Sequence, residues 1–530
     1  MTQFFINRPL QNKFAWSIVA KIPVYYSEIE QLWAKGVFMS NVQFGNMSCL
    51  SRKFIGKIQT AESVRISVKT DIREVLSVGV DSAVNSYESS QGEVSFYGKT
   101  NIKFLYSDGT TVLSSGYSAD FTASMTSELL DTDSKLTFDV VTVDSKVDIN
   151  ANTAMLTILL EVTAYAYVSD SVPYMLGSDE VFCKTDGVEI LQSCNIVNLP
   201  IVIDEELNAT RNITTVLVAE SNLCATDYTV MSGVLRIAGD ASVRLTYVSE
   251  GKIVTDTLPF SFERELDATG IDADSQLRLS LTVKNTKVRL DISENEVNTA
   301  FTVEITANAR IEATKIGVID VVNDAYGSNC DFLLERRSLT TTLPCGSTTE
   351  RKRISASLPL DTDKTVLTAV NVGAVVTNCQ SMEQRALIEG VVYATLLYAT
   401  DVGTESEQLE LPFSETVEVD YLMPQCQSFA DVAVMDFAVK DNGGLQAEME
   451  LCIDIVSERN VTFSVVVSAE EQPFDKSQLP AIEVCLAHKG ETLWQLAKGL
   501  HMSEEDLLAT NPEITNPLEQ DARIVIFNKI

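Results

Sequence analysis

The sequence contains only two histidines in 530 residues, His488 and His501, and both lie in the last fifty residues, in segments we expect to be exposed loops. Histidine is the commonest metal ligand and the side chain that titrates closest to neutral pH. The sequence also has no metal-ligand spacing, phosphate loop or nucleophile elbow. An enzyme is therefore the weakest hypothesis, and we expect no catalytic residue, metal or cofactor.

Long hydrophobic runs are absent as well. No stretch reaches the roughly 20 apolar residues that a helix needs to span a bilayer. Near the N-terminus the most apolar run, 14–20, is closed by Lys13 and Lys21, and no clear small-residue cleavage site follows it. We expect no membrane span and no signal peptide, and we assign residues 1–40 to an N-terminal extension.

The ten cysteines include no CxxC pair and are spread singly along the chain. Several have apolar neighbours, as Cys452 does between Leu451 and Ile453. This pattern favours free, buried thiols in a reducing compartment over a disulfide framework.

Basic residues are few relative to acidic ones. Forty Lys and Arg against 74 Asp and Glu give a formal net charge of −34. That charge repels nucleic acid and anionic lipid and favours a basic partner surface. Solubility of a large assembly component explains it equally well. We expect no nucleic-acid partner.

A sustained helical periodicity is almost missing between residues 41 and 460, where Val, Thr, Ile and Ser alternate with period two. The pattern indicates β structure, and it repeats. Three times a glycine precedes a tyrosine by eight residues, which places both on one face of a strand. The three pairs are Gly98 with Tyr106, Gly239 with Tyr247, and Gly390 with Tyr398.

Each tyrosine is followed by a turn and then by an aromatic residue: Phe121, Phe260 and Phe413. The tyrosines recur about every 150 residues, which suits whole domains in tandem. The repeated Gly, Tyr and Phe are either a shared ligand site or a close-approach glycine with core aromatics, and we favour the second interpretation. The sequence thus predicts three β domains.

The last fifty residues, 481–530, have the pattern of a β-α-α-β module. Gly490 allows the turn after the first strand, and proline ends the second helix. Trp494 is either a partner hot spot or a core residue of the first helix, and its position favours the core. The expected elements are a strand over 482–486, a helix capped by Thr492, a helix capped by Ser503 and ended by Asn511-Pro512, and a strand over 523–527.

This order resembles the LysM domain, a glycan-binding and protein-binding module. The matching residues are Gly490-Glu491-Thr492-Leu493-Trp494, Ala497, Leu507, Asn511-Pro512 and Asn516-Pro517. The family usually has Asp where Glu491 stands and Gly-Gln where Asp521-Ala522 stands.

In LysM domains the ligand groove lies between the first strand-helix loop and the loop after the second helix. The resemblance therefore implies a groove here, unless these residues only make turns and caps. The implied groove residues are Lys489, Gly490, Glu491, Thr492, Leu493, Asn511, Pro512 and Ile514.

The three-copy pattern resembles the SPOCS domain of endospore-coat proteins, and tandem SPOCS domains with one C-terminal LysM domain resemble SipL-type coat morphogenetic proteins. The implied fold is mainly β, with three tandem β-sandwich or barrel-like SPOCS-type domains followed by a small βααβ LysM domain. An acidic, proline-containing stretch is expected to be a linker that lets the tail move independently. The expected boundaries are 41–172, 180–318 and 326–468 for the β domains, 469–480 for the linker and 481–530 for the LysM domain.

The resemblance implies a non-enzymatic scaffold of the spore coat, cytoplasmic in the mother cell and located at the forespore surface. Its LysM domain would dock on a polymerising coat ATPase, while the β domains recruit or join other coat components. The alternative is a cell-envelope protein whose LysM domain binds N-acetylglucosamine-containing glycan, such as peptidoglycan or chitin. We favour protein docking, because peptidoglycan lies outside the membrane and the sequence shows no export signal.

Overall fold

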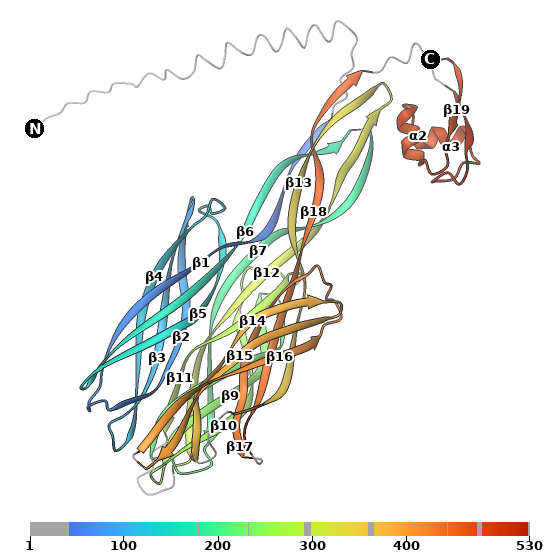
Figure 1. Ribbon diagram of the computed structural model, residues 1–530. Coiled ribbons are helices and arrows are strands. Elements are labelled where there is room, and N and C mark those ends of the chain that lie inside the picture. The colour runs from blue at the N-terminus through green and yellow to red at the C-terminus, as the bar shows by residue number, and fades with distance from the viewer. Residues whose placement is uncertain are drawn as a thin grey trace, which may run out of the picture.

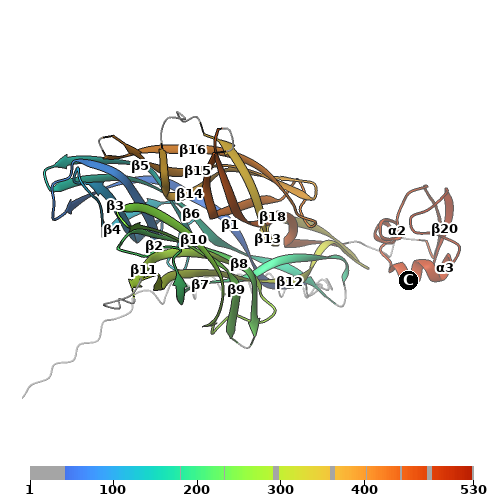
Figure 2. The same cartoon turned by 90° about the horizontal axis from the view of Figure 1, so that it is seen from below.

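The computed structural model describes residues 42–178, 181–231, 233–290, 298–358, 365–401, 403–441, 444–473 and 480–527. The expected N-terminal extension, 1–40, lies outside these residues. The described chain is mainly β, with antiparallel sheets and a C-terminal β-α-α-β segment, as the sequence predicts. Figures 1 and 2 show a body of strands, a narrower stalk at one end, and a small tail beyond the stalk.

The first six strands form two three-stranded sheets. β6 lies between β1 and β5, and β3 lies between β2 and β4. A shared hydrophobic cluster that includes Phe96, Phe104 and Leu156 draws on both sheets. The strands are β1 Gln43–Ser67, β2 Glu74–Ser90, β3 Glu93–Ser107, β4 Val112–Thr126, β5 Lys135–Asn150 and β6 Thr153–Gly177.

The next six strands repeat this arrangement. β12 lies between β7 and β11, and β9 lies between β8 and β10. Their cluster includes Leu235, Tyr247 and Val303. The strands are β7 Val181–Asn208, β8 Thr215–Met231, β9 Val234–Ser249, β10 Lys252–Asp267, β11 Gln276–Leu290 and β12 Ala300–Gly327.

The third group follows the same order, with β18 between β13 and β17 and β15 between β14 and β16. Its cluster includes Ile388, Leu411 and Ile453. One residue pair, Tyr326 with Asp331, joins β12 to β13, so the second and third groups share a sheet. The strands are β13 Cys330–Ser357, β14 Thr365–Met382, β15 Arg385–Thr400, β16 Gly403–Glu418, β17 Gln427–Asp441 and β18 Leu445–Pro473.

Each repeated glycine lies directly opposite a Phe of the neighbouring strand, and the Phe ring packs over the glycine. The cross-strand pairs are Gly98 with Phe121, Gly239 with Phe262, and Gly390 with Phe413. A Cβ atom added to Gly98 would lie 2.1 Å from the Phe121 ring. The repeated tyrosines Tyr106, Tyr247 and Tyr398 are buried. The interpretation as close-approach glycines with core aromatics is therefore confirmed.

The choice of Phe260 as the second aromatic of the repeat was wrong. Phe260 pairs with Ala241, whereas Phe262 pairs with Gly239. The sequence Leu-Pro-Phe-Ser around Phe260 is identical to that around Phe413 in the third copy. In the strand pairing, however, it is shifted by two residues relative to the repeated glycine.

Three two-stranded ribbons form the stalk (Figure 1). They are the paired ends of β1 with β6, β7 with β12, and β13 with β18. Apolar side chains from all three ribbons pack in common clusters, one of which includes Cys49, Ile190 and Leu339. We define the stalk as residues 42–51, 168–177, 181–194, 314–327, 330–345 and 458–473.

The expected linker, 469–480, differs in the structure. Residues 469–473 are the end of β18 and pair with 330–334 of β13. Glu470, Glu471 and Pro473, three of the residues that indicated a linker, thus occupy a ribbon at the stalk tip. Residues 474–479 lie outside the described part of the chain.

The expectation of free thiols is wrong for one pair of cysteines. Cys224 on β8 and Cys452 on β18 form a disulfide with their Cα atoms 6.3 Å apart. It connects the second group of strands to the third. Cys49, Cys194 and Cys426 are buried free thiols, as expected.

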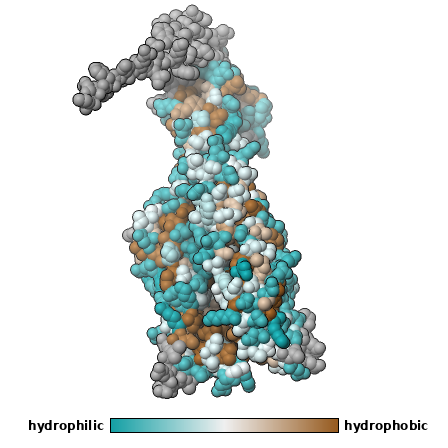
Figure 3. Space-filling view, turned by 90° about the vertical axis from the view of Figure 1, so that its left-hand side faces the viewer, coloured by the Kyte–Doolittle hydropathy of each residue, from teal (hydrophilic) through white to brown (hydrophobic). Residues whose placement is uncertain are grey.

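Polar areas and apolar patches alternate over the stalk and the body on the face that Figure 3 shows. No helix among the described residues has the length and apolarity to cross a membrane.

Candidate functional site

The C-terminal tail, residues 480–527, has the predicted β-α-α-β order. β19 Ile482–Ala487 pairs antiparallel with β20 Ala522–Phe527. Between them lie α2 Leu493–Gly499 and α3 Glu504–Thr510. The helices cover one face of the two-stranded sheet, and the shared core includes Ala497, Leu507 and Ile524.

Both helices begin at the residues that the sequence predicts. The Thr492 side chain accepts a hydrogen bond from the Gln495 amide, and the Gln495 side chain accepts one from the Thr492 amide, which forms a capping box. Ser503 accepts from the Asp506 amide at the start of α3. The turn before α2 uses Gly490 at φ +92°, where other residues are strained.

The residues of the implied groove occupy the two loops beside the helices. Lys489, Gly490 and Pro512 are exposed, whereas Glu491, Thr492 and Ile514 are half-buried and Leu493 and Asn511 are buried. The first loop is bonded to the segment before β20: the Leu493 amide donates to Asn516 Oδ1 at 3.1 Å, and the Leu518 amide donates to the Glu491 carbonyl at 2.9 Å.

Two polar groove residues are engaged by the tail itself. Asn511 Nδ2 donates to the Val525 carbonyl, and the Val525 amide donates to Asn511 Oδ1, both at 2.8 Å. The His488 amide donates to Glu491 Oε2 at 2.6 Å. Asn511 therefore ties the end of α3 to β20, and Glu491 closes its own loop.

The outer face of the tail sheet carries a row of exposed apolar side chains. Ile482 and Val484 are each 59% exposed, Leu486 is 58% exposed and Phe527 is 55% exposed. Ile482 lies opposite Phe527 and Leu486 lies opposite Arg523, so all of them share this face. We call Ile482, Val484, Leu486, Arg523 and Phe527 the outer face.

Sequence reasoning missed the outer face because it treats a short apolar strand as buried. On the inner side of β19 lie the smaller Cys485, opposite buried Ile524 on β20, and Ala487, opposite Ala522. The alternation of Ile482, Val484 and Leu486 with these smaller residues was the available signal.

The opposite side of the tail packs against the stalk tip. The Trp494 ring meets the Tyr326 ring edge-on, with centroids 5.0 Å apart. Trp494 Nε1 donates to Asp324 Oδ2 at 2.8 Å, and Lys498 Nζ forms an ion pair with Asp324 Oδ1 at 2.5 Å. Tyr326 Oη donates to the Met502 carbonyl at 2.8 Å. We call this set of contacts the tail–stalk contact.

The expectation that both histidines are exposed loop residues is wrong for His501. It is 5% exposed, with Nδ1 3.3 Å from the Gly327 carbonyl and Nε2 3.6 Å from Asp331 Oδ2. Its loop packs on the β12–β13 hairpin, which removes it from solvent. His488 is exposed, as expected.

Trp494 is half-buried: its ring packs against the tail core and also takes part in the tail–stalk contact. The contact uses α2 and the loop that follows it. The outer face stays exposed while the tail is docked.

We expect Asp324→Ala to weaken the tail–stalk contact. Burial raises the pKa of Asp324, but the hydrogen bonds from Lys498 and Trp494 outweigh burial and leave the pKa below its ordinary value, so the carboxylate is ionised at neutral pH. Loss of both bonds should cost about 2 kcal/mol, which lowers the docked-to-undocked ratio roughly 30-fold.

The measurement is Trp494 fluorescence in a chain with Trp16 and Trp33 replaced by Phe. Undocking should shift the emission to longer wavelength and increase quenching by acrylamide. Asp320→Ala is the matched control, because Asp320 lies exposed on the same strand. Equal spectra for the two variants would show that Asp324 does not hold the tail.

A buried cluster of charges lies where the three groups of strands meet. Tyr167 Oη donates to Glu312 Oε2 at 2.9 Å, and Glu312 Oε1 lies 3.8 Å from Arg278 Nε and 3.9 Å from Arg310 Nε. The Arg52 guanidinium stacks 4.1 Å from the centre of the Tyr165 ring. These partners come from β1, β6, β11 and β12, so the cluster, which we call the junction, joins strands of the first and second groups.

The third group reaches the junction through Glu458 on β18, whose Oε1 accepts a hydrogen bond from Arg52 Nη1 at 3.3 Å. Burial raises the pKa of Glu458, whereas the arginines around Glu312 hold the pKa of Glu312 below its ordinary value despite burial. Because these groups bond to one another between strands, we assign the junction a structural role.

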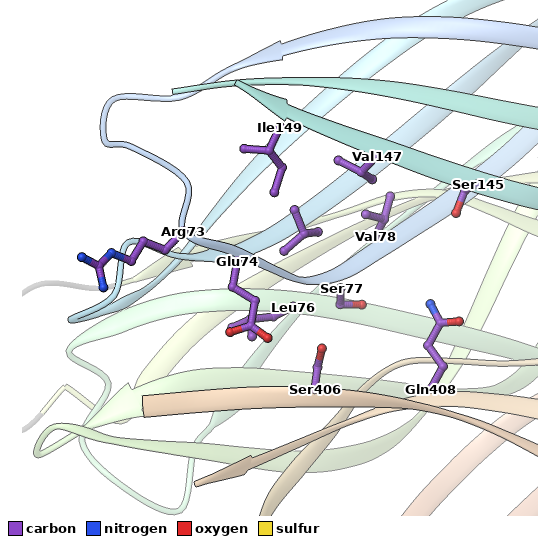
Figure 4. Close-up of a pocket in the computed structure, with 11 residues that line it drawn as sticks. Arg73, Glu74, Leu76, Ser77, Val78, Ser145, Val147, Ile149, Ser406 and Gln408 are labelled. Atoms are coloured by element: carbon purple, nitrogen blue, oxygen red, sulfur yellow. The ribbon is translucent and has the colours of Figure 1, made fainter. Parts of the chain in front are cut away.

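A groove of about 430 Å³ opens between the first and third groups. Figure 4 shows side chains of β2, β5 and β16 around it, with Glu74 directed toward Ser406. Burial, and then the nearby Glu405, raise the pKa of Glu74. The rest of the lining consists of Arg73, Gln408 and apolar or hydroxyl-bearing side chains, and we assign the groove no reaction.

Comparisons with models of protein families, with curated proteins and with solved structures found no match. Among the described residues, no group of three His, Cys, Asp or Glu side chains is placed to hold a metal ion.

Proposed function

We propose that the chain is a non-enzymatic scaffold of the endospore coat, in which three tandem β-sandwich domains of the SPOCS type carry a C-terminal LysM domain. The LysM domain docks on a polymerising coat ATPase at the forespore surface in the mother cell, and the β domains recruit or join other coat components. The sequence resemblance, the three equivalent groups of strands and the β-α-α-β tail support this assignment.

The observation that carries protein docking is the outer face. Apolar side chains that stay more than half exposed on a folded module mark an interaction surface, and a flat apolar centre is typical of protein–protein interfaces. Arg523 at its margin adds a charge that an acidic group on the partner can pair with.

Glycan binding by the implied groove is the second candidate. Lys489, Gly490 and Pro512 are exposed and available to a ligand, which favours it. Asn511 and Glu491, the groove residues best suited to hydrogen-bond a sugar, are already bonded within the tail. Because these two side chains already make hydrogen bonds within the tail, we favour protein docking over glycan binding.

We expect the full chain to bind filaments of the coat ATPase, and a chain that lacks 481–530 to lose binding. Val484→Asp should weaken binding roughly 30-fold or more, since a buried interface centre does not tolerate an unpaired charge. Because Val484 is exposed in the free chain, this variant should fold normally. The measurement is a sedimentation or fluorescence titration of ATPase filaments with each chain.

Lys489→Ala is the control variant, because Lys489 is an exposed residue of the implied groove and does not belong to the outer face. It should bind the ATPase as the unaltered chain does. Weakening by Lys489→Ala with no effect of Val484→Asp would place the site in the groove. Saturable binding to a chitin or peptidoglycan oligomer, with none to the ATPase, would contradict docking and support the glycan function.

A further inference from the structure

Two free thiols lie in van der Waals contact within the third group of strands. The Sγ atoms of Cys345 and Cys426 are 3.3 Å apart, although the residues are separated by 81 positions in the chain. A disulfide bond is about 2.05 Å long, so closure needs an approach of only about 1.3 Å. The pair is distinct from the Cys224–Cys452 disulfide, which joins two different groups of strands.

The local backbone explains why Cys345 reaches Cys426. Pro344 pairs with Glu458 and Gly346 pairs with Ser457 on β18, so Cys345 is the extra residue of a β-bulge. A bulge breaks the regular ladder at this position and redirects its side chain. Cys426 lies in the turn before β17, where its amide donates to the Met423 carbonyl at 3.0 Å. The two thiols therefore approach each other from β13 and from the turn before β17, the two strands on either side of β18.

The two cysteines differ in exposure. Cys345 is half-buried, whereas Cys426 is 7% exposed and belongs to the hydrophobic cluster of the third group. A small oxidant in solution reaches Cys345 first, and Cys426 is then the thiol that resolves the intermediate.

We propose that Cys345 and Cys426 are a redox modification site, which a low-molecular-weight disulfide oxidises to a second intramolecular disulfide. The Cys345 thiolate attacks the small disulfide, forms a mixed disulfide and releases one small thiolate. The Cys426 thiolate then attacks Cys345 Sγ, closes the protein disulfide and releases the second small thiolate. The two protons lost by the cysteines end on the two small thiols, so the protein is oxidised by two electrons and the small disulfide is reduced by two.

Burial, and then contact with Cys426, raise the pKa of Cys345 to about 12. Only the thiolate attacks a disulfide, so the reaction is slow at neutral pH and accelerates as the pH rises. The pair therefore stays reduced during brief exposure to oxidant and closes under sustained oxidising conditions.

The Cys345–Cys426 disulfide would cross-link β13 to the start of β17, with β18 between them. Glu458 lies on the part of β18 between the two cross-linked segments, and it binds Arg52 of the first group. Oxidation would thus restrain the strand that brings the third group to the junction. A cross-link of this kind stabilises mainly by restricting the unfolded chain.

The test treats the full chain with oxidised glutathione at pH 8.5, blocks remaining thiols with N-ethylmaleimide, and maps peptides by mass spectrometry. We expect a peptide pair linked through Cys345 and Cys426, reversed by dithiothreitol. We also expect the unfolding temperature to rise by roughly 5 °C on oxidation. Cys345→Ser should abolish both changes, whereas Cys379→Ser, which replaces another half-buried cysteine of the same group, should abolish neither.

Recovery of Cys345 and Cys426 as blocked thiols after prolonged oxidation of the folded chain would overturn the proposal. Linkage of either residue to a different cysteine would overturn it as well. A chain with Cys224→Ser and Cys452→Ser should still form the 345–426 link, which separates this site from the disulfide already present.

Discussion

Replacing Glu312 with Gln is expected to lower the free energy of unfolding by about 3–5 kcal/mol, the cost of removing one partner from a buried ion cluster. The Glu312 side chain is 2% exposed and faces Arg278 and Arg310, with Tyr167 bonded to its other oxygen. Glutamine keeps the shape but not the charge. The half-buried guanidinium groups of Arg278 and Arg310 would then lose the buried carboxylate that neutralises them.

Urea denaturation followed by tyrosine and tryptophan fluorescence measures this loss. Glu304→Gln is the matched control on the same strand, since Glu304 is 25% exposed and pairs with the mostly exposed Lys287. The control should change the unfolding free energy by less than about 1 kcal/mol. Equal losses for the two variants would show that the junction is not a desolvated network.

Gly239→Ala should have the second largest effect and lower the free energy of unfolding by about 3 kcal/mol. Its added Cβ would lie 2.3 Å from the Cys224 carbonyl oxygen and 3.0 Å from the Phe262 ring. The carbonyl cannot give way freely, because it belongs to β8, which pairs with β9 here, and Cys224 is held by its disulfide. Overpacking at such a site forces backbone shifts.

Thermal or urea unfolding of Gly239→Ala and Gly116→Ala measures this effect. Gly116 is exposed on β4, and a Cβ added there has its nearest neighbour, the Ile102 carbonyl, at 4.0 Å. Gly116→Ala should therefore change stability by less than about 0.5 kcal/mol in either direction. If Gly239→Ala proves as mild as this control, the glycine is not required by close approach.

Features set by neighbouring residues could be predicted from the sequence. Period-two alternation indicates strands because successive side chains point to opposite faces, and Thr492 and Ser503 predict helix starts because a cap acts within three residues. The Gly–Tyr repeat predicted a close approach, since glycine in a strand is costly unless another group needs the space.

Features set by contacts between distant segments could not be predicted. Trp494 bonds to Asp324, 170 residues away, and nothing local to α2 shows that its ring has a partner outside the tail. Cysteine connectivity does not follow from spacing, so the Cys224–Cys452 disulfide was missed. Cross-strand register, which places Phe262 rather than Phe260 on Gly239, is likewise a property of two strands together.

At the candidate site, too, local features could be predicted from the sequence and contacts between distant segments could not. The sequence placed the implied groove on the loops of the tail, but it could not show that Asn511 is buried and bonded to β20. The alternation along β19 was a signal for the outer face, but the exposure of Val484 depends on which side of the sheet the helices cover, and the sequence does not show that side.

The stalk sets a fixed distance between the tail and the strands of the body. The ribbon of 330–345 with 458–473 has sixteen residues in each strand, which at about 3.3 Å per residue amounts to roughly 50 Å. With the tail docked on its tip through Asp324 and Tyr326, the ribbon behaves as a rigid spacer rather than as a tether of variable length. A surface bound by the tail would therefore lie about this length from the strands of the body, and the number of residues in the ribbons determines that separation.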